Sequence, residues 1–306
     1  MEIIRPGINI DLVGKMKIAF VASLVAIILS VLSLLLHGGP NLGIDFAGGT
    51  QVQIKFSQET TAEGIRDSLQ TIGLGNSIIQ RFGYHANNEF LIKTEKSSSA
   101  LEGLSNKMAE ALEVSYGKEN FEIRRVEVVG PKVGKDLRQK GLLAMLYAVI
   151  GILIYVTWRF ELRYAVGAIA ALIHDVVITV GVFSLLGKEF TLPIIAALLT
   201  IIGYSLNDTI VVYDRIRENI KGARKQPLPE VVNSSINQVL SRTVLTSVTT
   251  LLVVLALFFL GGAVIHDFAF ALLVGILVGT YSSVFVASPT VLVWETISPS
   301  KEKRKQ

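Results

Sequence analysis

The chain has 306 residues, of which 51% are hydrophobic and only 18% are charged, with a formal net charge of +4 and no cysteine. Soluble globular proteins have about 25% charged residues, so this composition is typical of a membrane protein. The lack of cysteine excludes disulfide frameworks and thiolate metal or redox sites.

Six apolar segments reach the length of about 18 residues that a membrane-crossing helix needs. They are Ile18–Leu36, Gly141–Trp158, Tyr164–Leu186, Phe190–Tyr213, Thr243–Leu260 and Asp267–Trp294, the last of which is overlong. No A-x-A cleavage pattern follows the first segment, which favours an uncleaved anchor over a signal peptide. The pattern predicts an integral membrane α-helical bundle of six transmembrane helices with one soluble domain, at 37–140.

Lysine and arginine residues gather in alternating connections, and this pattern predicts the orientation of the chain. The basic positions are segment 1–17, Arg159, Arg163, the loop 214–242 and the tail 298–306. By the positive-inside rule these parts are cytoplasmic, together with both termini, and the domain 37–140 lies on the other side. Acidic and basic residues balance within 38–140. The basic excess therefore orients the protein and does not indicate nucleic-acid binding.

The domain after the first span shows alternating strand patterns interrupted by two helical patterns. In chain order these are "TQVQIKF", "TTAEGIRDSLQTIG", "SIIQRF", "FLIKTE", "SSSALEGLSNKMAEALEVSYG" and "FEIRRVEVVG". The order β-α-β-β-α-β predicts a ferredoxin-like α+β domain. His85 stands alone in the connector "GYHANNE" and is interpreted as a solvated turn residue. The domain shows no pattern of a nucleophile with its base, so we interpret it as a binding or lever module.

Polar residues inside the predicted spans are the candidate functional residues, because an ionised carboxylate in hydrocarbon is costly unless it has a partner. His174 and Asp175 lie near the middle of the third span, and Asn207 and Asp208 lie toward the cytoplasmic end of the fourth. Arg242 stands at the cytoplasmic entrance of the fifth span, from which its long side chain could extend toward Asp208.

Hydroxyl residues follow in the fifth and sixth spans, where they offer either a water chain for protons or bonds that join helices. They are Thr243, Thr246, Ser247, Thr249, Thr250, Tyr281, Ser282, Ser283 and Ser288. Each acidic candidate also has a purely structural interpretation. His174 and Asp175 would form a hydrogen-bonded pair that fixes the third span, Asp208 would reach headgroup water, and Arg242 would be an interface anchor. Gly275 and Gly279 predict close helix packing.

The cytoplasmic loop is predicted to form two short helices that are broken at "KQPLP". Its second half has an apolar side suited to the membrane surface or to a partner. This side consists of Val231, Val232, Ile236, Val239 and Leu240.

Five stretches of the chain resemble the SecD/SecF family of protein-export membrane proteins, which belongs to the RND superfamily. They are "NLGIDFAGGTQV", "ALIHDVVITVGVFSLLG", "LLTIIGYSLNDTIVVYDRIREN", "LSRTVLTSVTTLLVVLALFFLGG" and "FALLVGILVGTYSSVFVASP". They stand in the same order as in the family and span nearly the whole chain, with six spans.

The resemblance implies half of an RND-type unit, completed by SecD, in the bacterial inner membrane with the domain in the periplasm. It implies a subunit that uses the proton-motive force to promote completion of preprotein translocation. The implied partners are SecD, the SecYEG channel, YajC, YidC, the translocating preprotein and the lipid bilayer. No enzymatic reaction and no cofactor are implied, since the proton gradient is the energy source.

The resemblance also assigns residues. Asp208 in "SLNDTIVV" and Arg242 in "LSRTVLTS" match intramembrane proton-pathway positions of the family, whose partner acid belongs to SecD. Asn207, Asp175 and His174 are added to the predicted proton pathway because they are polar residues inside the predicted spans, and not because of the resemblance. A motif at the entry to the periplasmic domain is matched by Asp45, Gly48 and Gly49.

Two other functions compete with this interpretation. One is half of an RND-type proton-coupled solute exporter, which is disfavoured because such exporters carry large porter loops and two fused halves. The other is a non-conducting scaffold subunit that stabilises SecD. Loss of function on replacing Asp208, without loss of the complex, would separate the scaffold from the proton-driven subunit.

Overall fold

The structure is a computed structural model that describes residues 8–82, 88–94, 103–222 and 226–297. The chain divides into two compact units. The sheet unit comprises Leu42–Leu143 and Glu189–Leu192, and the helical unit comprises the rest. The tail 298–306, His85 and the serines proposed to open the second helix of the domain lie outside the described residues.

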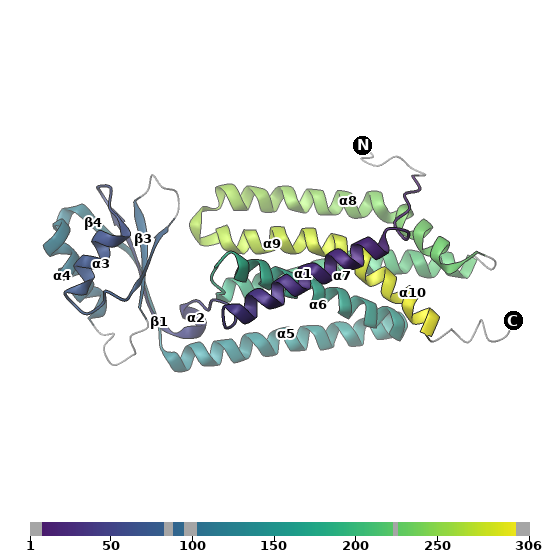
Figure 1. Cartoon of the computed structure of the whole chain (residues 1–306), viewed down its shortest axis with the longest axis horizontal. Coiled ribbons are helices and arrows are strands. Elements are labelled where there is room, and N and C mark those ends of the chain that lie inside the picture. The colour runs from purple at the N-terminus through teal and green to yellow at the C-terminus, as the bar shows by residue number, and fades with distance from the viewer. Residues whose placement is uncertain (1–7, 83–87, 95–102, 223–225, 298–306) are drawn as a thin grey trace. The chain divides into compact units, whose positions relative to one another are not determined.

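The sheet unit is built on four antiparallel strands in the order β2-β3-β1-β4. The strands are β1 (Gly49–Phe56), β2 (Ile78–Phe82), β3 (Glu89–Thr94) and β4 (Phe121–Val129). Helix α3 (Ala62–Gln70) connects β1 to β2, and α4 (Leu104–Tyr116) connects β3 to β4 (Figure 1). This is the predicted β-α-β-β-α-β order, and the small α+β domain is confirmed. The short helices α2 (Ile44–Ala47) and η3 (Lys118–Asn120) complete the unit.

The core of the sheet unit lies between one face of the sheet and the two helices. Alternate residues of β1 point into it, so Val52 and Ile54 are fully buried. Ile65 of α3 and Met108 of α4 are also fully buried against them. Since each such side chain contributes about 1.5–3 kcal/mol when buried, the alternation read from the sequence also accounts for the packing.

Among the residues that the structure describes, six helical spans are long and apolar enough to cross a membrane, which confirms the predicted bundle. Five are continuous helices and the sixth is divided by a π-helical segment, η4. The elements are α1 (Met16–Leu36), α5 (Pro131–Arg159), α6 (Leu162–Leu185), α7 (Leu192–Gly222), α8 (Leu228–Leu260), α9 (Gly262–Ser282), η4 (Ser283–Ala287) and α10 (Ser288–Ile297).

Three helices are longer than the apolar runs that predicted them. Helix α5 begins ten residues before Gly141, with a proline in the first turn, where its missing N–H costs nothing. Helices α7 and α8 continue into the predicted loop 214–242, α7 to Gly222 and α8 from Leu228. The chain is therefore broken near "KQPLP" as predicted, but the two short helices are extensions of the flanking spans.

The apolar side of the first turns of α8 packs inside the chain. Val232 and Ile236 are completely buried in a cluster that contains Tyr213 and Ile216 of α7, and Val231 is buried as well. The prediction of an interfacial or partner-binding side was wrong for these three residues. Amphipathic spacing shows that a helix face is buried, but does not show which surface covers it.

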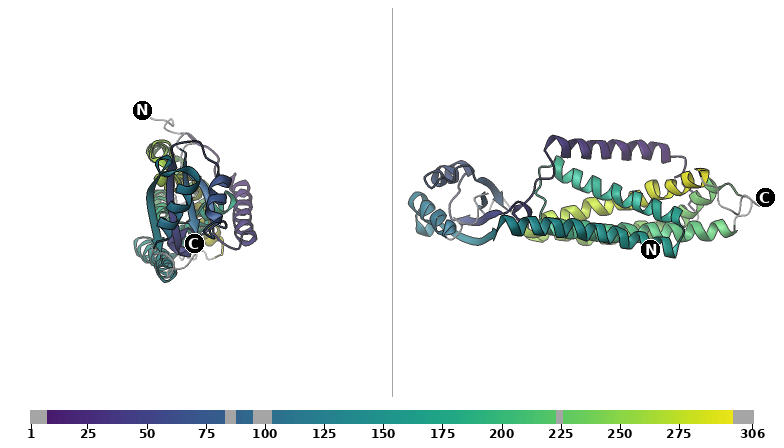
Figure 2. Two further views of the ribbon diagram at one scale, coloured as in Figure 1. Left: turned by 90° about the vertical axis from the view of Figure 1, so that its left-hand side faces the viewer. Right: turned by 90° about the horizontal axis from the view of Figure 1, so that it is seen from below.

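The helical unit has an interior set and an exterior set of helices. Helices α6 and α7 and the α9–α10 span are buried along about half of their length, whereas α1, α5 and α8 are mostly exposed. Figure 1 shows α8 alongside α9, and Figure 2 shows α1 at the margin of the unit. Two of the interior helices, α6 and α7, carry the acidic candidates Asp175 and Asp208.

Candidate functional site

Asp208 lies in the interior of the helical unit, on α7, and is 2% exposed. Its Oδ2 atom lies 3.4 Å from Ser247 Oγ on α8. The same hydroxyl lies 2.7 Å from Thr280 Oγ1 on α9, and Thr280 donates its own hydrogen to the carbonyl of Ile276. Ser247 has one hydrogen to donate, and the shorter contact to Thr280 is the stronger. Within the described residues, the one hydrogen-bonding contact of the Asp208 carboxyl is therefore long and weak, because it competes with Thr280 for the hydrogen of Ser247.

Arg242 and Asn207 do not line the pocket of Asp208. Arg242 is exposed, and no ion pair within the described residues joins it to Asp208, although its charge attracts that carboxylate from a distance. Asn207 is exposed on the outer side of α7. The sequence thus located the buried acid, but the predicted approach of Arg242 is not seen as a contact.

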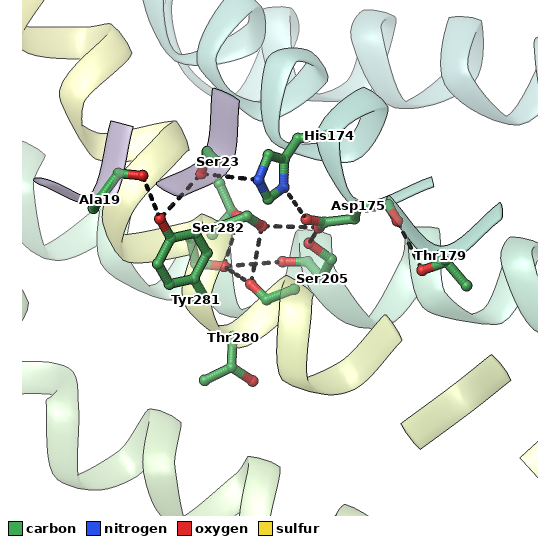
Figure 3. Close-up of polar contacts among 12 residues, drawn as sticks. Ala19, Ser23, His174, Asp175, Thr179, Ser205, Thr280, Tyr281 and Ser282 are labelled. Atoms are coloured by element: carbon green, nitrogen blue, oxygen red, sulfur yellow. Dashed lines mark hydrogen bonds and ion pairs between the residues drawn. The ribbon is translucent and has the colours of Figure 1, made fainter. Parts of the chain in front are cut away.

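His174 and Asp175 lie at the centre of a second polar cluster (Figure 3). Asp175 is fully buried and His174 is 3% exposed. Asp175 Oδ2 accepts hydrogen bonds from Ser205 Oγ of α7 at 2.6 Å and from Ser282 Oγ of α9 at 2.8 Å. Asp175 Oδ1 lies 2.9 Å from His174 Nδ1. The pair is thus a hydrogen-bonded node that joins α6 to both other interior helices.

The other edge of His174 leads to α1. Its Nε2 atom lies 3.1 Å from Ser23 Oγ, which is 3.0 Å from Tyr281 Oη. Tyr281 donates to the carbonyl of Ala19 at 2.7 Å, one turn before Ser23 (Figure 3). The cluster therefore joins α1, α6, α7 and α9 through polar side chains.

Consecutive residues of α9 and η4 contact both acidic clusters. Thr280 contacts the hydroxyl beside Asp208, and Ser282 contacts Asp175. Ser283 Oγ lies 3.0 Å from Thr209 Oγ1, next to Asp208 in the chain. Because these residues follow one another in the chain, one segment of the last span lies against both acids.

Several predicted hydroxyls serve their own helix instead. Thr246, Thr249 and Thr250 each donate to a backbone carbonyl three or four residues earlier in α8. This is the ordinary behaviour of hydroxyl residues in apolar helices.

Gly275 and Gly279 of α9 lie close to α7. A Cβ atom at Gly275 would lie 2.2 Å from Ile201, and one at Gly279 would lie 3.0 Å from Ser205. The prediction of close helix packing at both glycines is confirmed.

Three residues of these clusters were not singled out from the sequence. Ser23 is a hydroxyl residue in an apolar run, Ser205 follows Tyr204, and Thr280 stands directly before Tyr281. Hydroxyl residues within apolar runs commonly join membrane helices, which is a signal that marks all three as candidates for buried polar groups. It does not say which acid each of them contacts, since that depends on the packing.

Asp45, Gly48 and Gly49 form the turn that leads into β1 in the sheet unit. Asp45 Oδ2 accepts a hydrogen bond from the backbone N–H of Leu192, the first residue of α7, at 2.8 Å. Gly48 and Gly49 have φ values of +79° and +132°, which only glycine adopts readily, and a Cβ at Gly48 would lie 2.9 Å from Pro131 Cα. The motif shapes a tight turn and caps the start of α7.

Replacing Asp45 with alanine is expected to lower the free energy of unfolding by about 1 kcal/mol, because an N–H of the first turn of α7 loses its acceptor. Asp45→Asn should cost less, since its amide oxygen can still accept that bond. Equilibrium unfolding in lipid–detergent micelles measures both, with Asp136→Ala, at an exposed acid, as the control. Equal losses for alanine and asparagine would contradict the capping role.

The family models that match this chain and the relatives similar to it carry names of the same family. Residues 108–297 match the family model "Protein export membrane protein SecD/SecF, C-terminal", and residues 33–60 match "SecD/SecF GG Motif". The chain is 50% identical to the protein translocase subunit SecF of Magnetococcus marinus, over 98% of this chain and 97% of that one. It is 47% identical to the SecF of Vibrio alginolyticus, over 95% of this chain and 91% of the relative.

Two solved structures share the fold. The crystal structure of SecDF, a translocon-associated membrane protein from Thermus thermophilus, superposes with a TM-score of 0.83 at 41% identity. It matches 95% of this chain, which spans only 39% of that longer protein. SecDF in a super-membrane-facing form gives a TM-score of 0.72 at 42% identity, over 100% of this chain and 41% of that one.

Proposed function

This chain belongs to the SecD/SecF family of protein-export membrane proteins, and on that basis we propose that it uses the proton-motive force, together with SecD, to promote completion of preprotein translocation across the cytoplasmic membrane. Its relatives are named protein translocase subunits, and it has six candidate membrane spans. The observation that carries the proton-driven part is the burial of Asp208 with one weak hydrogen-bonding contact.

The proposed mechanism follows from the cost of charge at Asp208. The ionised carboxylate is poorly solvated there, and its attraction to Arg242 draws α7 and α8 toward one arrangement. Protonation removes the charge and that attraction, so a second arrangement of α7 and α8 becomes favourable. Each elementary charge that crosses the field releases about 2.3 kcal/mol per 100 mV, which supplies the work. In this proposal Arg242 acts at a distance, and the contact is made during the cycle.

The partners and the sidedness belong to the same proposal. SecD would cover part of the exposed apolar surface of α1, α5 and α8 and supply the partner acid, consistent with the greater length of the SecDF proteins. The SecYEG channel, YajC, YidC and the preprotein would be further partners. Both termini would be cytoplasmic and the sheet unit periplasmic, since the basic residues gather on the cytoplasmic side.

The test uses Asp208→Asn, co-expressed with SecD in inverted membrane vesicles that hold a preprotein halfway across. With nucleotide removed and a proton gradient imposed, completion should fall to the level seen without a gradient, because asparagine cannot take up a proton. Asp214→Asn is the matched control: the acid lies on the same helix but is exposed and paired with Arg159. Completion should then equal that of the unmodified chain.

Equal protein levels and intact association with SecD are required of all three chains. If Asp208→Asn completes translocation at the normal rate under the gradient, Asp208 is not the proton carrier. The chain would then be a scaffold for SecD.

A further inference from the structure

Hydrogen-bond donors can be counted along the contacts that surround His174. The count begins at the carbonyl of Ala19, which can only accept. Tyr281 Oη is 2.7 Å from this oxygen and donates its single hydrogen there. Ser23 Oγ is 3.0 Å from Tyr281 Oη, so the hydrogen between these two oxygens comes from Ser23. The single hydrogen of Ser23 is thereby used.

His174 must then be the donor to Ser23. The Nε2 atom of its ring is 3.1 Å from Ser23 Oγ, whose hydrogen points to Tyr281. A hydrogen bond across this contact requires a proton on Nε2. On the other edge of the ring, Nδ1 is 2.9 Å from Asp175 Oδ1. A lone pair on Nδ1 against an ionised carboxylate would be repulsive, so a proton lies between these two atoms also.

We propose that His174 and Asp175 form a proton-holding site that carries one proton more than a neutral histidine beside an ionised aspartate. In its occupied state the pair is electrically neutral overall, and all four contacts from Ala19 to Asp175 are hydrogen bonds. The proton count rests on the contacts alone. Its use as a step in transport rests on the function proposed above.

Burial supports the neutral state. Asp175 is 0% exposed. A buried charge without a counterion is costly. Its Oδ2 atom faces the hydroxyls of Ser205 on α7 and Ser282 on α9. Among the described residues, Tyr281 is the only other titratable side chain hydrogen-bonded into the cluster. Asp208 stands three residues beyond Ser205 on α7 and contacts Ser247 instead.

Loss of the proton changes the direction of the hydrogen bonds. The histidine then keeps one proton, which moves to Nδ1 to face the ionised carboxylate of Asp175. Nε2 becomes an acceptor and takes the hydrogen of Ser23, so no hydrogen remains between Ser23 and Tyr281. The bond between Ser23 of α1 and Tyr281 of α9 is lost, whereas Tyr281 stays bonded to the carbonyl of Ala19. The proton content of the pair thus sets whether one or two hydrogen bonds of Tyr281 hold α1.

The proposal requires a proton on Nε2 of His174, and the protonation state of this atom tests it. The full chain, with 15N-labelled histidine, is studied in complex with SecD in lipid bilayers by solid-state 15N NMR at neutral pH. The signals of His174 are assigned by their loss in His174→Gln. We expect a protonated Nε2. An Nε2 without a proton would overturn the proposal.

A pair of tyrosine variants tests the cause. Tyr281→Phe frees the hydrogen of Ser23 to point at His174, so the form with an unprotonated Nε2 should become populated. Tyr204→Phe is the matched control, because the Tyr204 hydroxyl bonds Thr250 and lies outside the chain of contacts. It should leave the His174 signals unchanged. Identical spectra for Tyr281→Phe and the unmodified chain would contradict the count.

This readout does not depend on transport. If Asp208→Asn leaves transport intact while Nε2 of His174 carries a proton, the proposed function fails and the proton-holding site stands. If Nε2 lacks a proton while Asp208→Asn abolishes gradient-driven completion, the proton-holding site fails and the proposed function stands.

Discussion

Replacing Asp175 with alanine is expected to lower the free energy of unfolding by on the order of 3 kcal/mol. The change removes the acceptor of Ser205 and His174 and leaves Ser282 with the carbonyl of Gly279, 3.1 Å away, as its acceptor. A buried donor without a partner costs about 1–3 kcal/mol, and bonds between membrane helices average nearer 0.6 kcal/mol, so two donors without this acceptor and one lost bond between helices give this order of magnitude. Equilibrium unfolding in lipid–detergent micelles measures the loss.

Two further variants give this prediction its controls. Asp175→Asn keeps the shape and one oxygen acceptor, and should lose less than half as much. Asp214→Ala removes an exposed acid and should change the stability by less than about 1 kcal/mol. A stability loss at Asp175→Ala no larger than at Asp214→Ala would mean that the cluster does not hold the helices together.

We expect Gly181→Val to increase the distance between α1 and α6. A Cβ atom at Gly181 would lie 2.1 Å from both Cβ and Oγ of Ser30 and 2.7 Å from Ser30 Cα, so the backbone of α1 must move. Overpacking of this kind costs about 1–3 kcal/mol, and this contact lies at the upper end because the obstacle includes backbone. The hydrogen bond of 2.8 Å between Ser33 and Ser184 lies on the same helix pair and should weaken with it.

The absence of native cysteine allows this separation to be measured directly. Cysteines placed at Ser33 and Ser184 should form a disulfide readily in the unmodified background and poorly in Gly181→Val. Gly203→Ala is the matched control, because no atom lies within 4 Å of a Cβ there, and cross-linking should be unchanged. Equal yields in all three backgrounds would show that α1 does not need the close approach at Gly181.

Much of the fold could be predicted because the decisive signals are local. Apolar length indicates a span and alternation indicates a strand, and both are read from neighbouring residues. The burial of Asp208 and Asp175 also follows from their place within long apolar runs. The interpretation failed where the outcome depends on distant residues. The apolar side of 231–236 needed a covering surface, and sequence alone did not show that α7 provides it.

The segment between α6 and α7 is a second place where the structure depends on residues that are distant in the chain. Four residues, Glu189–Leu192, belong to the sheet unit although they stand between two membrane spans. Lys93 forms an ion pair with Glu189, and the N–H of Gly43 donates to the carbonyl of Phe190 at 2.9 Å. No local pattern predicts such docking, because its partners lie about a hundred residues or more away in the chain. The capping role of Asp45 was hidden for the same reason.

The π-helical segment Ser283–Ala287 interrupts the last membrane span. A π turn closes its hydrogen bonds one residue later than an α turn, so it takes up one additional residue. In an α-helix one residue corresponds to a rotation of about 100°, and the phase of the following helix is offset by that order. The helices on the two sides of the segment are each regular, but the faces of one are rotated relative to the faces of the other. Ser282 and Val291 consequently belong to two separate helical patterns, each with its own buried side.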